Sequence, residues 1–477
     1  VDVLLRGRSP IYLVDGIPTE MTEMPLDPGE IESVTIIKDI AAKAMYGPVA
    51  ADGIISIKTY RGKINDKTIR VNAEKGTSMV DRMPAWTNGA DYARLNNLAR
   101  ANSGLNPLYT EDAIKKYESN DGYNMYYPSN NFSNQMFNKS MDYNRLNMSA
   151  SGGNEGIRYF SYLGISNEGD LFKIGSKADY NRIVSRSNLD IKINDLLKVR
   201  LGIYGTLGIR RSPVYSTGDE YLAFNNAIVD ATRIKPVAFP VYANNSAALE
   251  KPWYAVTADF GNNPIGELTG KGYSSEQARI GSGNIAFDFD MSHIVNGLTS
   301  ETYLGFNILN QVRKGKVENY TAYTVTPTLT SAGQDSVILT KVHDGVDQAD
   351  MSKLYDYYFQ TFVVSQTFRH NARIGKLGLL NTLTYNMSRA TRDGYTDDQR
   401  QQSFIWSGLL NYDNRFSLQT VVDYAGTYSF IKENRYALFP TIGAGWVISE
   451  EKFMKSLKFI NYLKLRAETG VLGYDNF

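Results

Sequence analysis

The sequence predicts an all-β transmembrane fold: a large antiparallel β-barrel preceded by a small mixed α/β unit. After Ile64 the chain falls into strand-length segments in which apolar and polar residues alternate, as strands between lipid and an aqueous lumen require. The first 62 residues instead combine short apolar runs with one helix signal. A soluble β-sandwich or propeller is the alternative, but the sequence lacks a repeat of blade length.

The small unit contains three apolar runs of strand length. We predict strands at Ile11–Asp15, Ser33–Lys38 and Ile54–Thr59. Asp15–Gly16 closes the first strand as a turn, and Gly53 opens the last strand.

The helix of this unit is predicted from its two ends. Asp39 stands at the N-cap position before the alanine-rich run IAAKAMY. Gly47 is placed to end the helix in a left-handed conformation, and Pro48 blocks its continuation. Strands and helix together predict a mixed α/β unit.

The alternation after Ile64 is clearest in one segment. Ile285, Phe287, Phe289 and Met291 share one predicted face, opposite Asn284, Ala286, Asp288 and Asp290. Carboxylates on one face and large apolar residues on the other suit a strand with water inside and lipid outside. Leu201–Ile209 and Phe416–Tyr424 alternate in the same way, and Asn296–Gly297 is predicted to form a tight hairpin turn.

We predict thirteen strands in this region, each near the ~9–11 residues that cross a bilayer. They begin near residues 66, 142, 157, 182, 197, 278, 298, 354, 374, 401, 415, 438 and 460. Long polar stretches lie at about 82–141, 212–277 and 312–353. Long loops at one end and short turns at the other are typical of bacterial barrels.

The composition excludes several classes of function. Basic and acidic residues number 51 and 50, so the net charge of +1 does not favour nucleic acid as a partner. There are no cysteines and only three histidines, which argues against a zinc site, a cysteine nucleophile or a cofactor. The chain contains no run of 18 apolar residues, so no transmembrane helix is predicted.

Five short segments follow one another between Pro10 and Lys63: PIYLVDGIP, IESVTIIKD, AMYG, ADGIISIKT and RGK. Each alone is ordinary turn chemistry, but in this order and spacing they resemble the plug signature of the SusC/RagA family of TonB-dependent transporters. The signature residues are Asp15, Gly16, Ile31, Glu32, Lys38, Tyr46, Gly47, Gly53, Lys58 and Gly62.

Further segments extend the resemblance over nearly the whole chain. Ser151–Phe172 and Arg186–Gly205 resemble two early hairpins of the family, and Phe439–Gly473 resembles a block in the middle of its barrel. Ala90–Pro128 resembles the family's first extracellular loop, which carries short helices.

The chain departs from the family pattern in its extent. Family members are roughly twice as long and begin with a small β domain and an energy-coupling box that contacts TonB. The chain lacks a signal peptide, so we expect Val1 to be a truncation point and the chain to stop in mid-barrel at Phe477. Thr59–Gly62 also lacks a second basic residue that the family usually has.

The resemblance implies a complete barrel of about 22 strands, with residues 1–63 as the C-terminal part of a lumenal plug and residues 64–477 as barrel. It further implies active import across the bacterial outer membrane, with the plug displaced by pulling from TonB. The implied partners are TonB, contacted through a segment outside this sequence, and a SusD-like surface lipoprotein over the barrel mouth. Glycans are the commonest cargo of the family, and peptides are the main alternative.

Aromatic residues in the long loops are candidates for binding such cargo, because their rings suit stacking on sugars. The candidates are Tyr123, Tyr126, Tyr127 and Trp253. The alternative is that these rings pack on one another or on a lipoprotein lid. The other tryptophans, for which we expect packing or a place at the membrane interface, are Trp86, Trp406 and Trp446.

Three polar patterns do not qualify as sites: the pair Asp288 and Asp290, the aspartates Asp344, Asp347 and Asp350, and the run Gly266–Gly272. The pair shares one strand face and is explained as lumenal polar groups rather than an acid–base pair. The three aspartates lack the spacing of a calcium loop, so we predict no metal site. The glycine-rich run lacks one spacer residue and the hydroxyl residue of a phosphate loop.

Two other classes of barrel protein fit less well. A passive porin closes with inward-folded loops, so an α/β unit at residues 11–62 argues against a porin or a purely structural barrel. A barrel enzyme requires a Ser/His or Asp/His arrangement, and His293, His343 and His370 are too scattered to supply one. We therefore predict a transporter that is not an enzyme.

Overall fold

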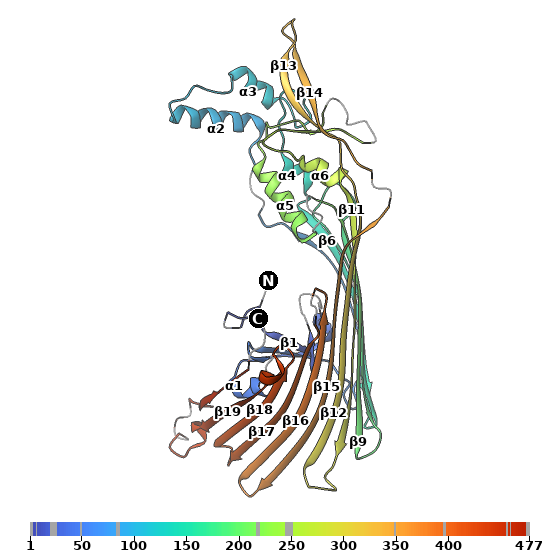
Figure 1. Ribbon diagram of the computed structural model, residues 1–477, viewed down its shortest axis with the longest axis vertical. Helices are drawn as coiled ribbons and strands as arrows, with labels where there is room; N and C mark the ends of the chain where they lie inside the picture. The colour runs from blue at the N-terminus through green and yellow to red at the C-terminus, as the bar shows by residue number, and fades with distance from the viewer. Residues whose placement is uncertain are drawn as a thin grey trace.

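The computed structural model describes residues 3–5, 7–19, 26–47, 50–82, 86–215, 220–243, 251–347, 350–394, 397–454, 457 and 459–473. Pro48, predicted to block a helix, lies outside them. The strands form three sheets. We call the small sheet near the N-terminus the plug unit and the thirteen-stranded sheet the barrel sheet. The three-stranded sheet and the helices around it, at the upper end of Figure 1, are called the head.

The plug unit is a mixed four-stranded sheet. Its elements are β1 (Ile11–Val14), β2 (Ile17–Thr19), a 3-10 turn (Pro28–Glu30), β3 (Ile31–Ile37), α1 (Ile40–Ala44) and β4 (Ile54–Thr59). The strand order is β2-β1-β4-β3, with β1 parallel to β4 and the other pairs antiparallel. The sequence predicts three of these strands and the helix. It misses β2, whose three residues include a proline and are too few for alternation to show.

The predicted backbone reversals of the plug unit are confirmed. Asp15 and Gly16 adopt φ angles of +49° and +93°, and β1 pairs with β2 directly across them. Gly47 follows α1 with a φ of +78°, as a helix-ending glycine does. Asp39 occupies the N-cap position of α1, although its side chain makes no capping hydrogen bond.

The barrel sheet contains the thirteen antiparallel strands that the alternation predicts. They are β5 (Lys67–Met79), β6 (Ser140–Gly153), β7 (Ile157–Gly169), β8 (Asp179–Lys192), β9 (Leu197–Pro213), β11 (Gly272–Asp290), β12 (Leu298–Val317), β15 (Ser352–Ile374), β16 (Leu377–Arg392), β17 (Gln399–Tyr412), β18 (Phe416–Thr427), β19 (Tyr436–Val447) and β20 (Lys464–Gly470). Short 3-10 turns lie at Lys432–Asn434 and Ile448–Glu450. Apart from the strands of the head, neighbours in the sheet are neighbours in sequence.

The predicted strand lengths are wrong. β15 has 23 residues and β12 has 20, against the ~9–11 that cross a bilayer. At ~3.3 Å per residue, β15 extends about 76 Å. The long strands therefore exceed the length that a bilayer requires, and Figure 1 shows that they lead into the head. For the same reason β11 begins and β12 ends inside two of the predicted loops.

The predicted turn at Asn296–Gly297 is present within a longer connection: the amide of Leu298 donates to the carbonyl oxygen of Val295 (3.0 Å), which places Asn296 and Gly297 at the centre of the turn. β11 ends at Asp290 and β12 begins at Leu298, so residues 291–297 form the connection. The amides of Ile294 and Val295 both donate to the carbonyl of Met291, and this single helical turn takes up the residues before Asn296. Gly297 closes the connection with a φ of +77°.

The two faces of the barrel sheet differ as predicted. On β9 the outward Ile203 is 67% exposed, whereas the neighbouring Tyr204 points inward and is 3% exposed. On β11 Phe289 is exposed, and Ala286 on the opposite face is buried. A continuous outward face of large apolar side chains is the surface that a barrel presents to lipid. No helix in the described ranges is long and apolar enough to cross a membrane.

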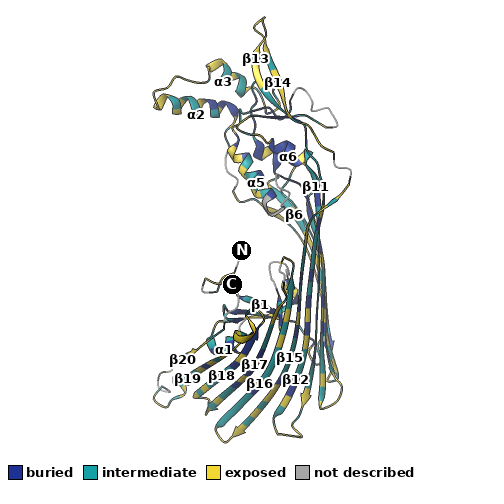
Figure 2. Ribbon diagram, viewed as in Figure 1, coloured by how far each residue is buried: buried dark blue, intermediate teal, exposed yellow. Residues whose placement is uncertain are grey.

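The head contains α2 (Gly89–Asn102), α3 (Glu111–Glu118), α4 (Phe132–Met136), α5 (Glu220–Arg233), β10 (Tyr254–Val256), α6 (Pro264–Gly270), β13 (Ala322–Leu329) and β14 (Asp335–His343). Its strand order is β10-β13-β14. A large cluster of buried apolar residues lies here, around α4, α5, α6 and β10. Figure 2 shows this concentration of buried residues around α6. The three predicted loops thus form a folded body.

Candidate functional site

The plug unit lies against the inward face of the barrel sheet, and the side chains between them form the candidate site. The turn after β1 organises its first part. Asp15 Oδ1 accepts a hydrogen bond from the Thr59 amide (3.0 Å), and Asp15 Oδ2 accepts one from the Thr59 hydroxyl (2.6 Å). These bonds join the ends of β1 and β4. The hydroxyl of Tyr303, on β12, donates to the Asp15 carbonyl oxygen (2.7 Å).

A buried ion pair lies beside this turn. Arg186 projects inward from β8, and its Nε donates to Glu30 Oε2 of the plug unit at 2.7 Å. Arg186 Nη1 is 3.4 Å from Asp15 Oδ2, so one guanidinium joins two plug carboxylates. The side chains of Arg186 and Glu30 are 4% and 0% exposed. The Arg186 guanidinium also lies 4.5 Å from the ring centroid of Tyr204.

Local structure of the plug fixes the position of Glu30. Asp27 and Glu30 form a capping box around the 3-10 turn, in which Glu30 Oε1 accepts a bond from the Asp27 amide (3.1 Å). Burial raises the pKa of the Glu30 carboxyl, and the positive charge of Arg186 acts against this shift. Removing one partner of such a buried pair costs about 3–5 kcal/mol, because a buried charge remains uncompensated.

Neighbouring contacts extend this side of the interface. Asn188 Nδ2 donates to the Thr59 hydroxyl (2.8 Å) and to the Tyr60 carbonyl oxygen (2.7 Å). Arg61 forms an ion pair with Asp190 of β8. We call this contact region on β7–β9, β11 and β12 the first flank.

Apolar side chains reinforce the first flank. Val14, Ile55 and Ile57 of the plug unit form one buried cluster with inward residues of the barrel sheet. These inward residues are Phe160, Tyr162, Val184, Tyr204, Ile280, Leu309 and Phe359. The plug unit and the barrel sheet therefore share a hydrophobic core on this side.

A second flank joins α1 to β18–β20. Arg466 of β20 pairs with Asp39 at 2.7 Å, with both side chains more than a third exposed. Glu468 Oε1 accepts a hydrogen bond from the Ile40 amide at the start of α1 (3.0 Å). Ala41, Ala44, Ile405 and Val421 form a small buried cluster beneath the helix. Exposed ion pairs contribute about 0–1 kcal/mol, so this flank is held less strongly by charge.

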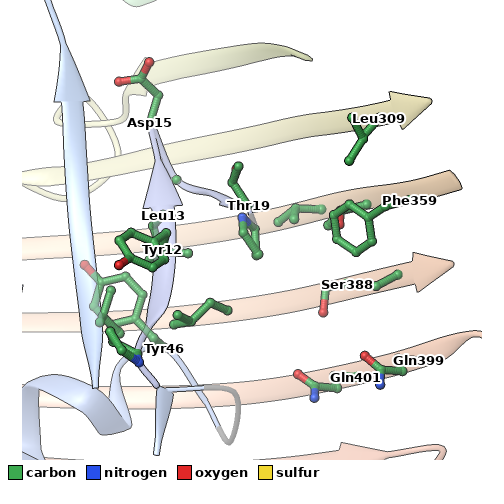
Figure 3. Close-up of a pocket in the computed structure, with 18 of the residues that line it drawn as sticks. Tyr12, Leu13, Asp15, Thr19, Tyr46, Leu309, Phe359, Ser388, Gln399 and Gln401 are labelled. Atoms are coloured by element: carbon green, nitrogen blue, oxygen red, sulfur yellow. The ribbon is translucent and has the colours of Figure 1, made fainter. Parts of the chain in front are cut away.

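Between the two flanks lies a cavity of about 1690 Å³. Most of its barrel-side lining comes from β15, β16 and β17, and its other wall is the plug unit. In Figure 3 Tyr12 and Tyr46 lie on the plug side of the opening, with Ser388 and Gln401 on the strands across it. We call this cavity the gap.

The predicted plug-signature residues occupy three kinds of position. Asp15 and Gly16 contact the first flank, and Tyr46 lines the gap. A Cβ on Gly47 would lie 2.7 Å from Ser403 Oγ, and one on Gly62 would lie 2.4 Å from the Tyr159 amide nitrogen, so both glycines permit close approach. The remaining signature residues lie within or beside β3 and β4, and are Ile31, Glu32, Lys38, Gly53 and Lys58.

Sequence reasoning missed the residues of the ion pairs. Asp27 and Glu30 have the D-x-x-E spacing of a capping box, which was a usable signal for Glu30. Arg186 and Arg466 carried no such signal, because each is an inward polar residue on a strand whose partner lies more than 150 residues away.

The four aromatic candidates for cargo binding lie in or beside the head. Tyr123 packs on Tyr242, with ring centroids 5.7 Å apart, and Trp253 packs on Tyr323 at 5.1 Å. The hydroxyl of Tyr127 accepts a bond from Lys116 Nζ (3.2 Å). Tyr126 is half-buried, and its amide donates to Asn124 Oδ1 (2.9 Å).

The polar patterns set aside in the sequence have structural roles. Asp288 forms two hydrogen bonds with Arg200, at 2.6 and 2.8 Å. Asp344 pairs with Lys341, and Asp347 pairs with Lys251. The run at 266–272 belongs mostly to α6. Among the described residues, His, Asp and Glu side chains do not gather in groups of three or more that could hold a metal ion.

Comparison with known proteins agrees with this geometry. No family model matches the chain. It is similar to TonB-dependent receptor P39 of Formosa agariphila, with 25% identity over 504 residues that cover 98% of this chain and 43% of the relative. It is also similar to TonB-dependent receptor SusC of Bacteroides thetaiotaomicron, with 21% identity over 98% of this chain and 46% of the relative.

Solved structures show the same fold. The RagAB peptide transporter matches with a TM-score of 0.70 and 17% identity, over 98% of this chain and 54% of that chain. The siderophore receptor PirA from Acinetobacter baumannii matches with a TM-score of 0.51 and 12% identity, over 96% and 52%. The chain thus spans about half the length of the relatives it matches.

The large antiparallel barrel sheet matches the barrels of TonB-dependent receptors, and the small mixed sheet on its inward face is plug-like. The matched proteins are receptors and transporters, in agreement with the prediction that the chain is not an enzyme. In sequence the chain is similar to SusC and other TonB-dependent receptors, and in fold to the RagAB transporter, and it covers about half of each of these proteins.

Proposed function

We propose that the protein imports oligomeric nutrients actively across the outer membrane, with TonB pulling on the plug. The supporting observation is how the plug unit is held. Ion pairs and hydrogen bonds on two flanks bind it to the barrel sheet, and such contacts break and re-form without covalent change.

The energetics of these contacts differ between the two flanks. The Glu30–Arg186 pair is almost fully buried, and breaking it by removing one partner costs about 3–5 kcal/mol, because a buried charge is then left uncompensated. The exposed Asp39–Arg466 pair contributes only about 0–1 kcal/mol. The first flank is therefore the stronger attachment, and the work that is proposed to come from TonB acts first against the weaker contacts.

For the cargo we propose glycans, with oligopeptides as the alternative. Glycans are favoured by the resemblance of the plug signature to a family that mostly imports them. The similarity to a peptide transporter favours peptides. A passive porin or structural barrel is the less favoured function.

We further propose that a SusD-like lipoprotein covers the head. This proposal follows from the resemblance of the plug signature, and the candidate contact residues are leucines in or just after α2 that are more than half exposed: Leu95, Leu98, Leu105 and Leu108.

Deleting TonB tests the proposed function. Uptake of the native nutrient by intact cells is expected to stop, while the amount of protein in the outer membrane stays unchanged. Uptake that continues at the wild-type rate without TonB would refute active import and leave passive diffusion.

Isolation of the complex from native membranes tests the cargo and the partner. A co-purifying lipoprotein with bound oligosaccharide would support glycan import, and bound peptide would redirect the assignment to oligopeptides. Isolation of the protein without a lipoprotein would contradict the proposed partner.

A further inference from the structure

The gap extends along the plug unit in the direction of the strands. The inward residues of β15 line it from Tyr355 to Arg369, which are 14 residues apart. At ~3.3 Å per residue, this corresponds to about 46 Å along the strand. Ser9–Leu13 and Tyr46 of the plug unit line the same cavity. The gap is therefore a continuous space beside the plug rather than a pocket on top of it.

The part of the gap wall that β15–β17 form is uncharged over most of its length. Arg392 lies at the upper end of β16, and Arg369 lies near the lower end of β15. Between these two arginines the lining residues of the three strands are neutral, and most carry hydroxyl or amide groups, such as Thr361, Ser365, Thr384, Asn386, Ser388 and Gln401. Charged residues line the same cavity from β9, β11 and β12: Arg200, Arg210, Glu276, Glu301 and Arg313.

This chemistry contrasts with that of the first flank. There, inward residues such as Ile280 and Tyr204 are buried against the plug unit, and Arg186 holds two plug carboxylates. In the gap, hydroxyl and amide side chains line the cavity, and Thr361, Thr382 and Ser403 are buried in its wall. Thr361 Oγ1 and Asn386 Oδ1 are buried and lack a hydrogen-bond partner among the described residues. A chain that carries hydroxyl or amide groups satisfies such a wall once the gap widens.

We propose that cargo passes the plug through the gap, along β15–β17, while the first flank stays in place. This inference rests on the proposed import function and names its route. The cargo that the wall fits is an uncharged chain with hydroxyl or amide groups. Tyr12 and Tyr46 supply rings on the plug side on which such a chain can stack. Widening this side requires the plug to tilt away from β15–β17, and the buried Glu30–Arg186 pair remains closed as the pivot.

Cysteine labelling tests the route without knowledge of the cargo. The chain contains no cysteine, so a thiol introduced here is unique within it. Ser388→Cys places the thiol in the gap. Ser149→Cys is the matched control, because Ser149 is also a half-buried serine on the inward face, and it pairs with Tyr162 on the first flank. The probe is a maltose-conjugated maleimide added to intact cells.

Labelling of Ser388→Cys is expected to rise several-fold in energised cells that contain TonB, relative to cells without it, while labelling of Ser149→Cys stays constant. An equal or larger rise at Ser149→Cys would overturn the proposal, because the whole plug would then leave the first flank. If uptake of the native nutrient depends on TonB but neither thiol responds, the route is refuted and the import function stands. If uptake does not depend on TonB, the import function itself fails.

Uptake measurements provide a second and independent readout. Ser388→Trp narrows the gap and is expected to reduce uptake of the native nutrient several-fold, whereas Ser149→Trp reduces it less. Equal uptake by the two variants would contradict the route. Heat-modifiable migration on gels confirms that each barrel is folded. In the labelling experiment, Thr384→Cys, which also lines the gap, replaces Ser388→Cys if that variant does not assemble.

Discussion

Replacing Arg186 with methionine is expected to loosen the plug without unfolding the barrel. Methionine keeps much of the length of the side chain but removes the charge that holds Glu30 and Asp15. Both members of the Arg186–Glu30 pair are almost fully buried, so solvent does not screen the loss. Breaking the pair costs about 3–5 kcal/mol. Because ~1.4 kcal/mol is a tenfold change, the released population should rise by about two to three and a half orders of magnitude.

The consequence is measured as leak in cells that lack TonB, so that pulling makes no contribution. Arg186→Met should raise susceptibility to vancomycin and increase the conductance of the purified protein in planar bilayers. The matched control is Arg466→Met, which removes a plug–barrel ion pair of the same 2.7 Å length but with exposed partners. Its expected cost is about 0–1 kcal/mol.

A double variant separates the lost attraction from the uncompensated charge. In Arg186→Met with Glu30→Met, both charges are gone, and apolar replacement of a buried pair is often close to neutral. This protein should leak less than Arg186→Met alone. Equal leak from Arg186→Met and Arg466→Met, or greater leak from the double variant, would refute the idea that burial makes the first pair dominant.

Three further predictions concern single contacts. Without Arg186 the pKa of Glu30 rises further, because the positive charge no longer opposes the effect of burial. Acidification through that pKa should neutralise Glu30 and reduce the leak of Arg186→Met. Leak that does not change with pH would contradict this. Gly47→Ala combines a left-handed φ of +78° with a Cβ 2.7 Å from Ser403 Oγ, and should weaken plug docking by at least the ~1–2 kcal/mol of backbone strain, measured by plug release in urea. Adding Ser403→Ala should restore only the contact part, and full recovery would argue against strain. Asn263→Ala removes the cap of α6 and two bonds to buried carbonyl oxygens, so amide hydrogen exchange should increase across the head while the barrel strands stay protected.

The strands of the barrel sheet were predictable because each carries its own signal. Alternation of period two is local, and it survives in β9, β11 and β18 because one face contacts lipid. The lengths were not predictable from the bilayer alone. β12 and β15 continue into the head, where the environment of their side chains changes but their pairing does not.

The plug–barrel contacts were not predictable for the opposite reason. An arginine on the inward face of a strand fits the alternating pattern equally well whether its side chain contacts water or a carboxylate, so the pattern does not reveal its partner. Arg186 and Glu30 become partners only when the sheet curves around the plug unit, and 156 residues separate them in the chain. The helices α5 and α6 were missed in the same way, because their apolar residues gain a partner only when distant loops assemble into one core.

The polarity of the inward face shows where the plug unit is held and where it is not. A water-filled barrel needs polar inward residues on every strand. Ile280 of β11 and Leu309 of β12 are exceptions, because they are apolar residues on the inward face. Both are buried in a cluster with plug residues. On β16 the rule returns, with Thr384 and Ser388 facing the gap. Ile280 is buried where the plug unit packs on the barrel sheet, and Thr384 and Ser388 lie where the plug unit and the barrel wall are separated by the gap. Single residues of the barrel strands therefore decide how strongly each side of the plug unit is held. Exchanging Ile280 for serine should weaken the first flank by the loss of one buried side chain, about 1.5–3 kcal/mol.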